Sequence, residues 1–414
     1  MTEMKLVSKL LMFKGFKAVS LGFEGRGKGD IIITVKPHKN GCRCPQCGRR
    51  GNIVHTRGPR RWRDVRVCGR TVWLQYCPRE IRCPTHGRHV EQFPWAEPGS
   101  RATYRLEYLL LRHCQAMPQS TAAQMLDMPP STVSDLLHRV IKRVRQGHRI
   151  RDLKRIGIDE ISYAKGHKYA TLVYDLERSC VVWVGRGKGR DTIDRFFEDA
   201  LSASQKARIQ WACCDMSDTF IGAITHHCPR AQLVLDRFHV VKLLNDAVDE
   251  VRKEQWRQAC QEDRKALKGL RWLLYRHSST RSRKQTRTLK ALEKANLRIY
   301  RAWRLKDEFE QLWEYKAPWA AKRFFNNWTT AAMRSRLEPL KKFVRTARKY
   351  APAILAFVQT HLTNAIAEGL NRIVKIVKNR ASGFRDLDPF ADMIFLTVGD
   401  VDIPAHISPR FRTL

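Results

Sequence analysis

Short apolar runs and helical periodicities alternate along the chain and predict its elements. The first forty residues hold two strand-like runs, FKAVSLGFEG and DIIITVKPH, joined by a glycine-rich turn. Residues 101–149 repeat their apolar positions with a helical period, which the sequence DMPP interrupts at residues 127–130. Residues 245–350 are also helical by period and rich in aromatic and basic side chains. The pattern predicts a β module, a pair of helices, a sheet domain and a long helical region.

The sheet domain is predicted from strand-like runs between residues 155 and 244. Three runs come in succession and helix-like segments separate the others, an order typical of an α/β domain with a mixed sheet. The five runs are RIGIDEIS, KYATLVYDL, CVVWVGR, RIQWACCD and AQLVLD. With PWAEPGS interpreted as a linker, we expect a β module over residues 1–95, a second module over 100–150, a sheet domain over 151–244 and 351–400, and a helical insertion over 245–350.

The chain carries a large excess of positive charge. Its 414 residues include 78 Lys or Arg against 40 Asp or Glu, a formal net charge of +38, while 43% are hydrophobic. The charge attracts a polyanion, and the hydrophobic content excludes a disordered polycation. Nucleic acid is the expected partner. The alternative is an anionic membrane surface. The sequence contains no apolar run of about 18 residues, the length needed to span a bilayer, so we expect no membrane partner.

Cysteine usage and the N-terminal sequence indicate the compartment. The start of the chain lacks the apolar core and small-residue cleavage site of a signal peptide. Several of the 12 Cys, among them Cys180, Cys213 and Cys214, lie in strand-like apolar runs, which suits a reducing environment with buried thiols. We therefore expect a cytoplasmic protein that associates with the nucleoid by binding DNA.

A cysteine-rich segment predicts a structural zinc site. Cys44 and Cys47 form a C-x₂-C pair, and Cys83 and His86 repeat that spacing. Tetrahedral Zn²⁺ takes four such ligands, and the flanking Pro and Gly residues favour turns that aim two ligands at one ion. The sequence RTVWLQYCPREIRC is expected to form a hairpin, and the alternative is an arginine-rich β unit with free thiols. Further candidate ligands are Cys42, Cys68, Cys77 and His89.

The sequence QSTAAQMLDMPPSTVSDLLHRVIKRV predicts a helix-turn-helix. Ser131 or Thr132 is expected to cap the second helix, with a buried stripe of Val133, Leu136, Leu137, Val140 and Val144. In the DNA-binding geometry the side chains that face base edges are Ser131, Thr132 and Ser134. The side chains expected to reach phosphates are His138, Arg139, Lys142 and Arg143. The alternative is an ordinary helical hairpin within a larger helical core.

Three carboxylates, Asp159, Asp215 and Glu368, are the candidate catalytic residues. The first two end apolar runs that resemble buried strands, and the third lies in a helix-like stretch among cations. Carboxylate oxygens hold Mg²⁺ or Mn²⁺, and a pair of such ions stabilises the attacking and leaving oxygens of phosphoryl transfer. The alternative for each Asp is that it only caps the helix after its strand.

Other polar residues surround the candidate acids. On a helix, Asn364, Glu368, Arg372 and Lys375 share one face, so that the cations could hold phosphate beside a metal-binding carboxylate. The alternative is a solvated helix with ordinary salt bridges. Asp236 and His239, in VLDRFHVVK, could form an auxiliary polar site or cap the next helix. The insertion adds 28 Lys or Arg against 9 acids over residues 252–349, which suits contact with DNA.

The joint order of these motifs resembles the ISL-three family of bacterial insertion-sequence transposases. The matching segments are the zinc knuckle, the helix-turn-helix, GIDE, DMS, DRFH, the helical insertion, NAIAEGLNR and GFRDLDPF. The resemblance implies a ribonuclease-H-like mixed sheet core with a helical insertion, preceded by a zinc-binding β module and a helix-turn-helix. One departure is His86, where the family pattern leads us to expect Cys.

The resemblance also implies an activity and its residues. Asp159, Asp215 and Glu368 would form an Asp-Asp-Glu site with two Mg²⁺ ions, and the substrate would be double-stranded DNA at terminal inverted repeats together with target DNA. A homo-oligomer, most simply a dimer, is expected. The two rival functions are a non-catalytic DNA-binding regulator with the same zinc and helix-turn-helix modules, and a structure-selective nuclease.

Overall fold

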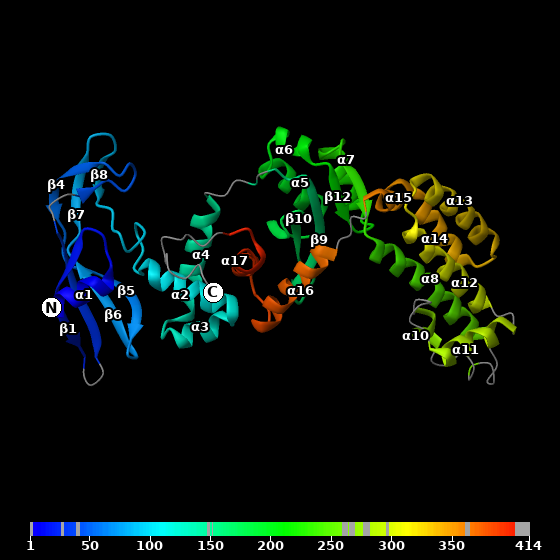
Figure 1. The fold of residues 1–414 in the computed structure, drawn as a ribbon, viewed down its shortest axis with the longest axis horizontal. Helices are drawn as coiled ribbons and strands as arrows, with labels where there is room; N and C mark the ends of the chain where they lie inside the picture. The colour runs from blue at the N-terminus through cyan, green and yellow to red at the C-terminus, as the bar shows by residue number, and fades with distance from the viewer. Residues whose placement is uncertain are drawn as a thin grey trace. The chain divides into compact units, whose positions relative to one another are not determined.

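A computed structural model describes residues 3–25, 29–38, 42–146, 150, 152–258, 264, 270–275, 282–294, 298–360 and 365–401 (Figure 1). These residues form two compact units. The first contains the described parts of Met1–Arg149 and Val377–Thr397, and the second contains those of Ile150–Ile376 and Val398–Asp400. Within the described residues, no helix is both long enough and apolar enough to cross a membrane.

Two four-stranded sheets make up the N-terminal module of the first unit. One has the order β1-β2-β6-β5, and the other has the order β3-β4-β7-β8. The first sheet buries a cluster of aromatic rings that includes Trp62, Tyr76 and Trp95. The elements are α1 (Glu3–Leu11), β1 (Phe16–Glu24), β2 (Asp30–Pro37), β3 (Cys42–Arg43), β4 (Arg50–Thr56), β5 (Arg60–Val67), β6 (Arg70–Tyr76), β7 (Arg79–Cys83) and β8 (Gly87–Val90).

The structure corrects two predictions for this module. RTVWLQYCPREIRC does not fold into a hairpin, because its two halves, β6 and β7, belong to different sheets. PWAEPGS is not a free linker either. Trp95 is 1% exposed within the aromatic cluster, and its carbonyl accepts a hydrogen bond from the backbone N–H of Tyr104 at 2.8 Å. Burial of that indole ties the sheet module to the helices that follow.

Three helices follow the sheets: α2 (Tyr104–Ala116), α3 (Gln119–Met125) and α4 (Pro130–Gln146). The break predicted at residues 127–130 separates α3 from α4. α4 begins at Pro130, so neither Ser131 nor Thr132 is its N-cap. Proline suits the first position of a helix because a backbone N–H there would have no acceptor within the helix, so its absence costs nothing. The buried stripe includes Ile141, whereas the predicted Val144 is only partly buried.

The second unit is built on a five-stranded mixed sheet with the order β11-β10-β9-β12-β13. β10 is antiparallel to both of its neighbours, β9 and β11, whereas β12 and β13 run parallel to β9. All five predicted strands are present, in the topology of a ribonuclease-H-like core. Its elements are β9 (Arg155–Ala164), β10 (Lys168–Asp175), β11 (Cys180–Arg186), α5 (Arg190–Asp199), α6 (Ala203–Arg208), β12 (Trp211–Cys214), α7 (Asp218–His227) and β13 (Gln232–Leu235).

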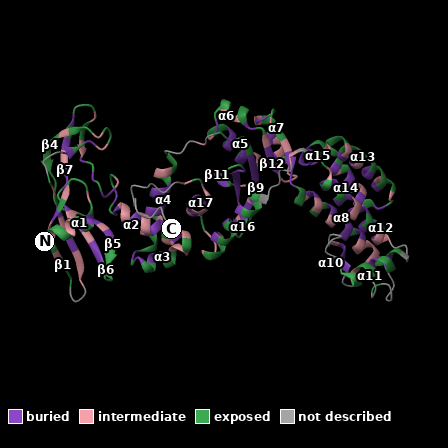
Figure 2. Cartoon of the chain, viewed as in Figure 1, coloured by how far each residue is buried: buried purple, intermediate pink, exposed green. Residues whose placement is uncertain are grey.

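A helical region follows the last strand and shares one hydrophobic core with the sheet. Figure 2 shows that its helices alternate buried and exposed positions, as amphipathic helices do. Trp303, Trp313 and Trp328 are buried, whereas Trp272 and Trp319 are exposed. The elements are α8 (Arg237–Gln258), α10 (Leu270–Tyr275), α11 (Arg283–Lys294), α12 (Arg298–Glu310), η2 (Gln311–Glu314), α13 (Pro318–Arg334), α14 (Glu338–Lys349), α15 (Ala351–Thr360) and α16 (Ala365–Arg380).

Two predicted domain limits do not coincide with the structure. The boundary between residues 244 and 245 falls inside α8, which starts directly after β13. Most of α17 (Leu387–Val398) packs in the first unit, although residues 351–400 were grouped with the sheet domain. There Asp392 accepts from the Nδ1 of His138 at 2.9 Å, and the Arg145 guanidinium lies over the Phe395 ring. The division into four domains otherwise stays a prediction.

Candidate active site and zinc centre

Asp159, Asp215 and Asp236 lie at one edge of the core sheet. β9 pairs in parallel with β12, with Gly157 opposite Cys213, and β12 pairs in parallel with β13. Parallel strands end at the same edge of a sheet, so Asp215 and Asp236, which directly follow β12 and β13, emerge side by side. Asp159 lies two residues beyond Gly157, and the register therefore places it level with Asp215.

Asp159 is held from two sides. Its Oδ1 accepts from the backbone N–H of Glu160 at 2.7 Å, and its Oδ2 accepts from the Nδ2 of Asn371 on α16 at 2.5 Å. The fully buried Tyr174 on β10 donates its hydroxyl to the Oδ1 of Asn371 and so fixes that amide. Burial raises the pKa of Asp159 to about 6, despite these donors.

Asp215 and Asp236 each accept a backbone N–H at the start of the following helix. The Oδ1 of Asp215 accepts from Ser217 at 3.1 Å, and the Oδ1 of Asp236 accepts from Phe238 at 3.2 Å. The capping alternative is therefore correct for Asp236, which directly precedes α8, but not for Asp215, because the N-cap of α7 is Ser217 and no side chain caps that helix. It does not account for the burial that raises the pKa of Asp215, because an ordinary cap is solvated.

Two further titratable groups face the same acids. His239 Nδ1 lies 3.3 Å from Asp236 Oδ2, and this contact raises the pKa of His239, with Asp215 and Asp159 adding to the effect. Glu160 is half-buried, and burial raises its pKa, although Lys188 opposes the change. The auxiliary pair Asp236 and His239 thus lies beside the two acids, as the sequence suggested.

α16 carries the remaining candidates. Asn371 reaches Asp159, and Glu368 lies three residues earlier, in the first turn of the same helix, so both side chains lie on neighbouring positions of one face. Glu368, Arg372 and Lys375 are exposed. Asn364 lies outside the described residues. The structure therefore brings Asp159 together with Asp215, places Glu368 one helical turn from a direct contact of Asp159, and leaves the two cations in solvent.

Sequence reasoning missed the functional position of two residues. Asn371 was not among the candidate site residues, although its i+3 spacing from Glu368 was a usable signal. Tyr174 gave no signal, because it looks like any alternating residue of a buried strand. Their hydrogen bonds join β10, α16 and β9 into one support for Asp159.

The donor set at this edge suits a divalent cation. Burial disfavours the charged form of Asp159 and Asp215 and raises the pKa of both, so a bound cation that neutralises the charge stabilises these carboxylates. All of the donor atoms are oxygens, which Mg²⁺ and Mn²⁺ prefer. In the part of the chain that the structure describes, these acids do not form a tight cluster of three or more ligand atoms. Asp159 and Asp215 are thus the two acids best placed to bind one cation together, and a third carboxylate would have to move closer to complete the site.

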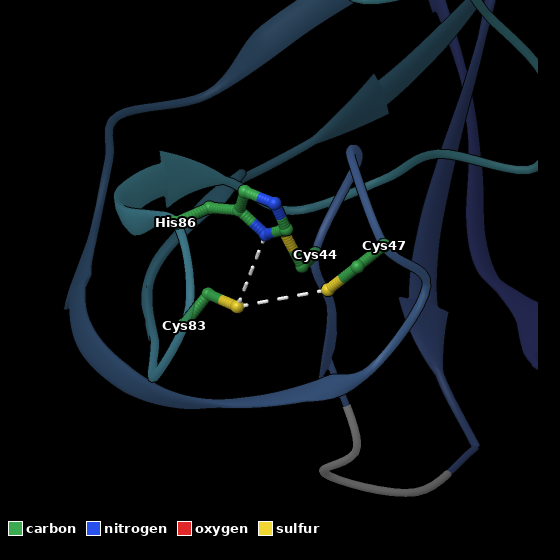
Figure 3. A group of neighbouring side chains, drawn as sticks. All are labelled: Cys44, Cys47, Cys83 and His86. Carbon is green, nitrogen blue, oxygen red and sulfur yellow. Dashed lines mark hydrogen bonds between the residues drawn. The ribbon is translucent and has the colours of Figure 1, made fainter.

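The four predicted zinc ligands converge at the second sheet of the N-terminal module. Figure 3 shows the side chains of Cys44, Cys47, Cys83 and His86 turned toward one point, and their ligand atoms all lie within 4.8 Å of one another. The Sγ atoms of Cys47 and Cys83 are 3.7 Å apart, and Cys83 Sγ lies 3.7 Å from His86 Nδ1. A tetrahedron with Zn–S bonds of about 2.3 Å has edges of about 3.8 Å, so the cluster fits structural zinc.

The local backbone prepares this site. The ligands lie in or beside the turns of two short hairpins, β3–β4 and β7–β8. Backbone N–H groups of Thr85 and then His86 donate to Cys83 and lower the pKa of its thiol to about 6, so the thiolate form that binds metal is favoured. His86 thus occupies the position for which the family pattern led us to expect Cys.

The proposed DNA-reading face of α4 is partly committed to internal contacts. Ser131 is exposed, and Thr132 and Ser134 are partly exposed, so all three can meet a ligand. Arg139 is exposed but donates to the Gly99 carbonyl at 3.3 Å. Two of the side chains that were predicted to reach phosphates also pair with acids of their own unit. Those side chains are His138, paired with Asp392, and Arg143, which donates to the buried Glu107 at 2.8 Å.

Comparisons with known proteins agree with this architecture. The transposase model of the ISL3 DDE domain matches residues 156–394, the helix-turn-helix domain of transposase family ISL3 matches 91–141, and the zinc-finger of transposase IS204/IS1001/IS1096/IS1165 matches 40–86. The predictions of a zinc module, a helix-turn-helix and a transposase core, in that order, are thereby confirmed.

Similar whole proteins are also transposases. The transposase for insertion sequence element IS1001 of Bordetella parapertussis is 32% identical over 94% of this chain and 97% of its own length. The transposase for IS1557 of Mycobacterium tuberculosis is 27% identical, with 91% of each chain covered. The Drosophila P element transposase strand transfer complex aligns with 72% of this chain and 92% of its own at 11% identity and a TM-score of 0.39. The family match over more than half of the chain shows that it belongs to the ISL3 family of insertion-sequence transposases.

Proposed function

We propose that this transposase cleaves DNA at the terminal inverted repeats of its element and transfers the strands to target DNA, using Asp159, Asp215 and Glu368 as a metal-binding Asp-Asp-Glu site. The observation that carries the proposal is the hydrogen bond from Asn371 to Asp159, since it brings α16, and with it Glu368, to the edge where Asp159 and Asp215 meet. Helix capping alone gives no reason for α16 to contact Asp159.

Each residue has a distinct part in this proposal. Asp159 and Asp215 would supply the first carboxylate oxygens, and Glu368 would complete the site. Bound Mg²⁺ or Mn²⁺ would activate the attacking hydroxyl and stabilise the leaving oxygen. Asn371 and Tyr174 orient Asp159, and His239 with Asp236 places a proton-holding group beside the acids. Arg372 and Lys375, exposed on α16, would hold a phosphate of the same DNA.

The other modules would select and retain the DNA. The zinc module and the first turn of α4, with Ser131, Thr132 and Ser134, are proposed to recognise the inverted repeat, and Arg139 to contact its backbone. The insertion, with 28 cations against 9 acids over residues 252–349, would hold flanking or target DNA. We also propose that the active species is a homo-oligomer, most simply a dimer, that acts in the cytoplasm on nucleoid DNA.

A strand-transfer assay with a Glu368→Gln variant tests the function. The purified protein, Mg²⁺, a labelled inverted-repeat end and target DNA are incubated together. Wild type should yield strand-transfer products, whereas Glu368→Gln should bind the end normally and lose at least about 10³-fold of the product rate. Glu198→Gln, an exposed glutamate on α5, is the matched control and should behave as wild type. Cleavage without transfer would favour the nuclease, and binding alone the regulator.

The raised pKa of Asp159 predicts how metal binding depends on pH. Burial places this pKa at about 6, above the ordinary 3.8, so the metal-free protein keeps a proton there at pH 5 that it has lost at pH 7.5. The proton competes with the cation, and Mn²⁺ affinity measured by electron paramagnetic resonance should therefore be about tenfold weaker at pH 5 than at pH 7.5. Equal affinity at the two pH values would contradict the assignment of Asp159 as a ligand.

A further inference from the structure

A hollow in the helical insertion has the chemistry of a nucleobase site. It has a volume of about 490 Å³ and lies between α13 and the segment from the end of α12 through η2. Along α13, bulky residues alternate with Ala320 and Ala331, whose small side chains leave the space open. Every residue that lines it is described by the structure and belongs to the second unit.

Aromatic rings form much of its wall. Tyr315 and Phe324 pack with ring centroids 5.3 Å apart and planes tilted by 37°. Trp328 is buried and fixed, because its indole N–H donates to the Leu305 carbonyl at 2.8 Å. Trp319, at the rim, is 71% exposed, the highest exposure among the large hydrophobic side chains that the structure describes. Such exposure costs hydration free energy, so a ring that covers Trp319 would bind favourably.

Polar groups at the rim narrow the choice of ligand. Gln311 and Asn327 carry amides that can both donate and accept, and Arg323 lies one turn after Trp319 on the same face of α13. Amides pair with the edge of a base, an aromatic ring stacks on its face, and an arginine holds its phosphate. The surplus of cations across the insertion attracts DNA rather than an apolar peptide or a metabolite without phosphate.

We propose that this hollow binds an unpaired nucleobase of the DNA substrate, stacked on Trp319. A base inside a duplex has both faces covered by its neighbours and its edge paired, so only an unpaired or displaced base can present a face to Trp319 and an edge to Asn327. The inference shares with the proposed function only the DNA ligand, because binding of a base requires none of the carboxylates.

Photocrosslinking in EDTA tests the site without any metal-dependent cleavage. Two DNA ligands share the same inverted-repeat sequence and carry one 5-iodouracil near the end. In the first ligand this base is unpaired, because the opposite strand has a gap there. In the second ligand it is paired with adenine. Wild type should crosslink the unpaired base several-fold more than the paired one, with the adduct mapped by mass spectrometry to Trp319 or Tyr315. Trp319→Ala should lose that crosslink and bind the unpaired ligand about tenfold more weakly.

Three variants separate stacking from other causes. Trp319→Phe keeps a ring and should retain most of the crosslink, whereas Ala331→Leu fills the hollow and should reduce it. Trp272→Ala removes a tryptophan of similar exposure, 69%, on α10 and should match wild type. Equal crosslinking of the paired and unpaired bases, or an unchanged crosslink in Trp319→Ala, would overturn the proposal. Unchanged crosslinking with loss of self-association in Trp319→Ala would instead assign the hollow to a second copy of the chain.

Discussion

Asp159→Asn should abolish strand transfer and leave the metal-free protein at least as stable as wild type. The loss of activity follows because a neutral amide cannot replace the charge of a ligand carboxylate, and we expect a reduction of at least about 10³-fold. The stability result follows from burial. Burial raises the pKa of wild-type Asp159 to about 6, so at pH 7.5 the carboxylate is charged although its buried position disfavours the charged form. This costs part of the free energy of folding. An asparagine removes that cost, and this gain offsets the one hydrogen bond that its amide nitrogen cannot accept.

The thermal response to Mn²⁺ measures both effects in one experiment. Wild type should unfold at a higher temperature when Mn²⁺ is added at pH 7.5, because a ligand that binds only the folded state stabilises it. Asp159→Asn should show a melting temperature in EDTA equal to or above that of wild type, and a much smaller rise with Mn²⁺. DNA binding to an inverted-repeat end should be unchanged, since Asp159 and α4 belong to different units.

Asp175→Asn is the matched control, because Asp175 is a buried aspartate on the neighbouring strand with a purely structural role. Its Oδ1 accepts from the backbone N–H of Glu177 at 2.9 Å, and its Oδ2 from the Nε of Arg178 at 2.8 Å. Replacing it should lower the melting temperature and leave the Mn²⁺ response intact. If Asp159→Asn behaves as this control does, Asp159 supports the fold and is not a metal ligand.

The strand ends were predictable from the sequence because they rest on local chemistry. Apolar runs mark buried strands, and Asp215 and Asp236 directly follow β12 and β13 as such runs end. Asp159 was expected to end its strand as well, but β9 continues to Ala164 because its later residues pair with β10. Because β9 pairs in parallel with β12, and β12 with β13, the three acids lie at one level of the sheet, so they follow from the pattern together with the topology. The zinc cluster was predictable for a similar reason, since the C-x₂-C spacing fixes two ligands per turn.

Contacts between distant segments were not predictable in this way. Nothing near Arg143 in the sequence indicates that its guanidinium forms an ion pair with the buried Glu107. The burial of Trp95 was equally hidden, because it depends on contacts with aromatic rings from other segments, such as Trp62. The link from Tyr174 through Asn371 to Asp159 joins residues that lie about two hundred positions apart. Periodicity reports which face of an element is buried, but it does not report which partner buries it.

Cys83→Ala should unfold the zinc-binding sheet and leave the aromatic sheet beside it intact. The hydrophobic cluster of the zinc-binding sheet consists of Cys42, Cys44, Ile81 and Cys83, which is too small to offset the entropy of ordering four short strands. Zinc binding contributes about 10–16 kcal/mol in zinc-finger peptides, as much as the whole stability of a typical domain. Removing one of four ligands removes most of that contribution.

The expected result is loss of bound zinc with local proteolysis. Zinc content by mass spectrometry should fall from about one ion per chain to near zero, and trypsin should cut in Arg50–Thr56 and Arg79–Cys83, while the strands around Trp62 stay protected. Cys77→Ala, an exposed cysteine six residues earlier in the same module, is the control and should keep its zinc. The variant should also lose affinity for the inverted-repeat end but keep Mn²⁺ binding at the acids, because the zinc cluster and the acids lie in separate units. Full zinc occupancy in Cys83→Ala would show that another side chain completes the site. The first to test would then be His89, whose Nε2 contacts the carbonyl of the ligand His86.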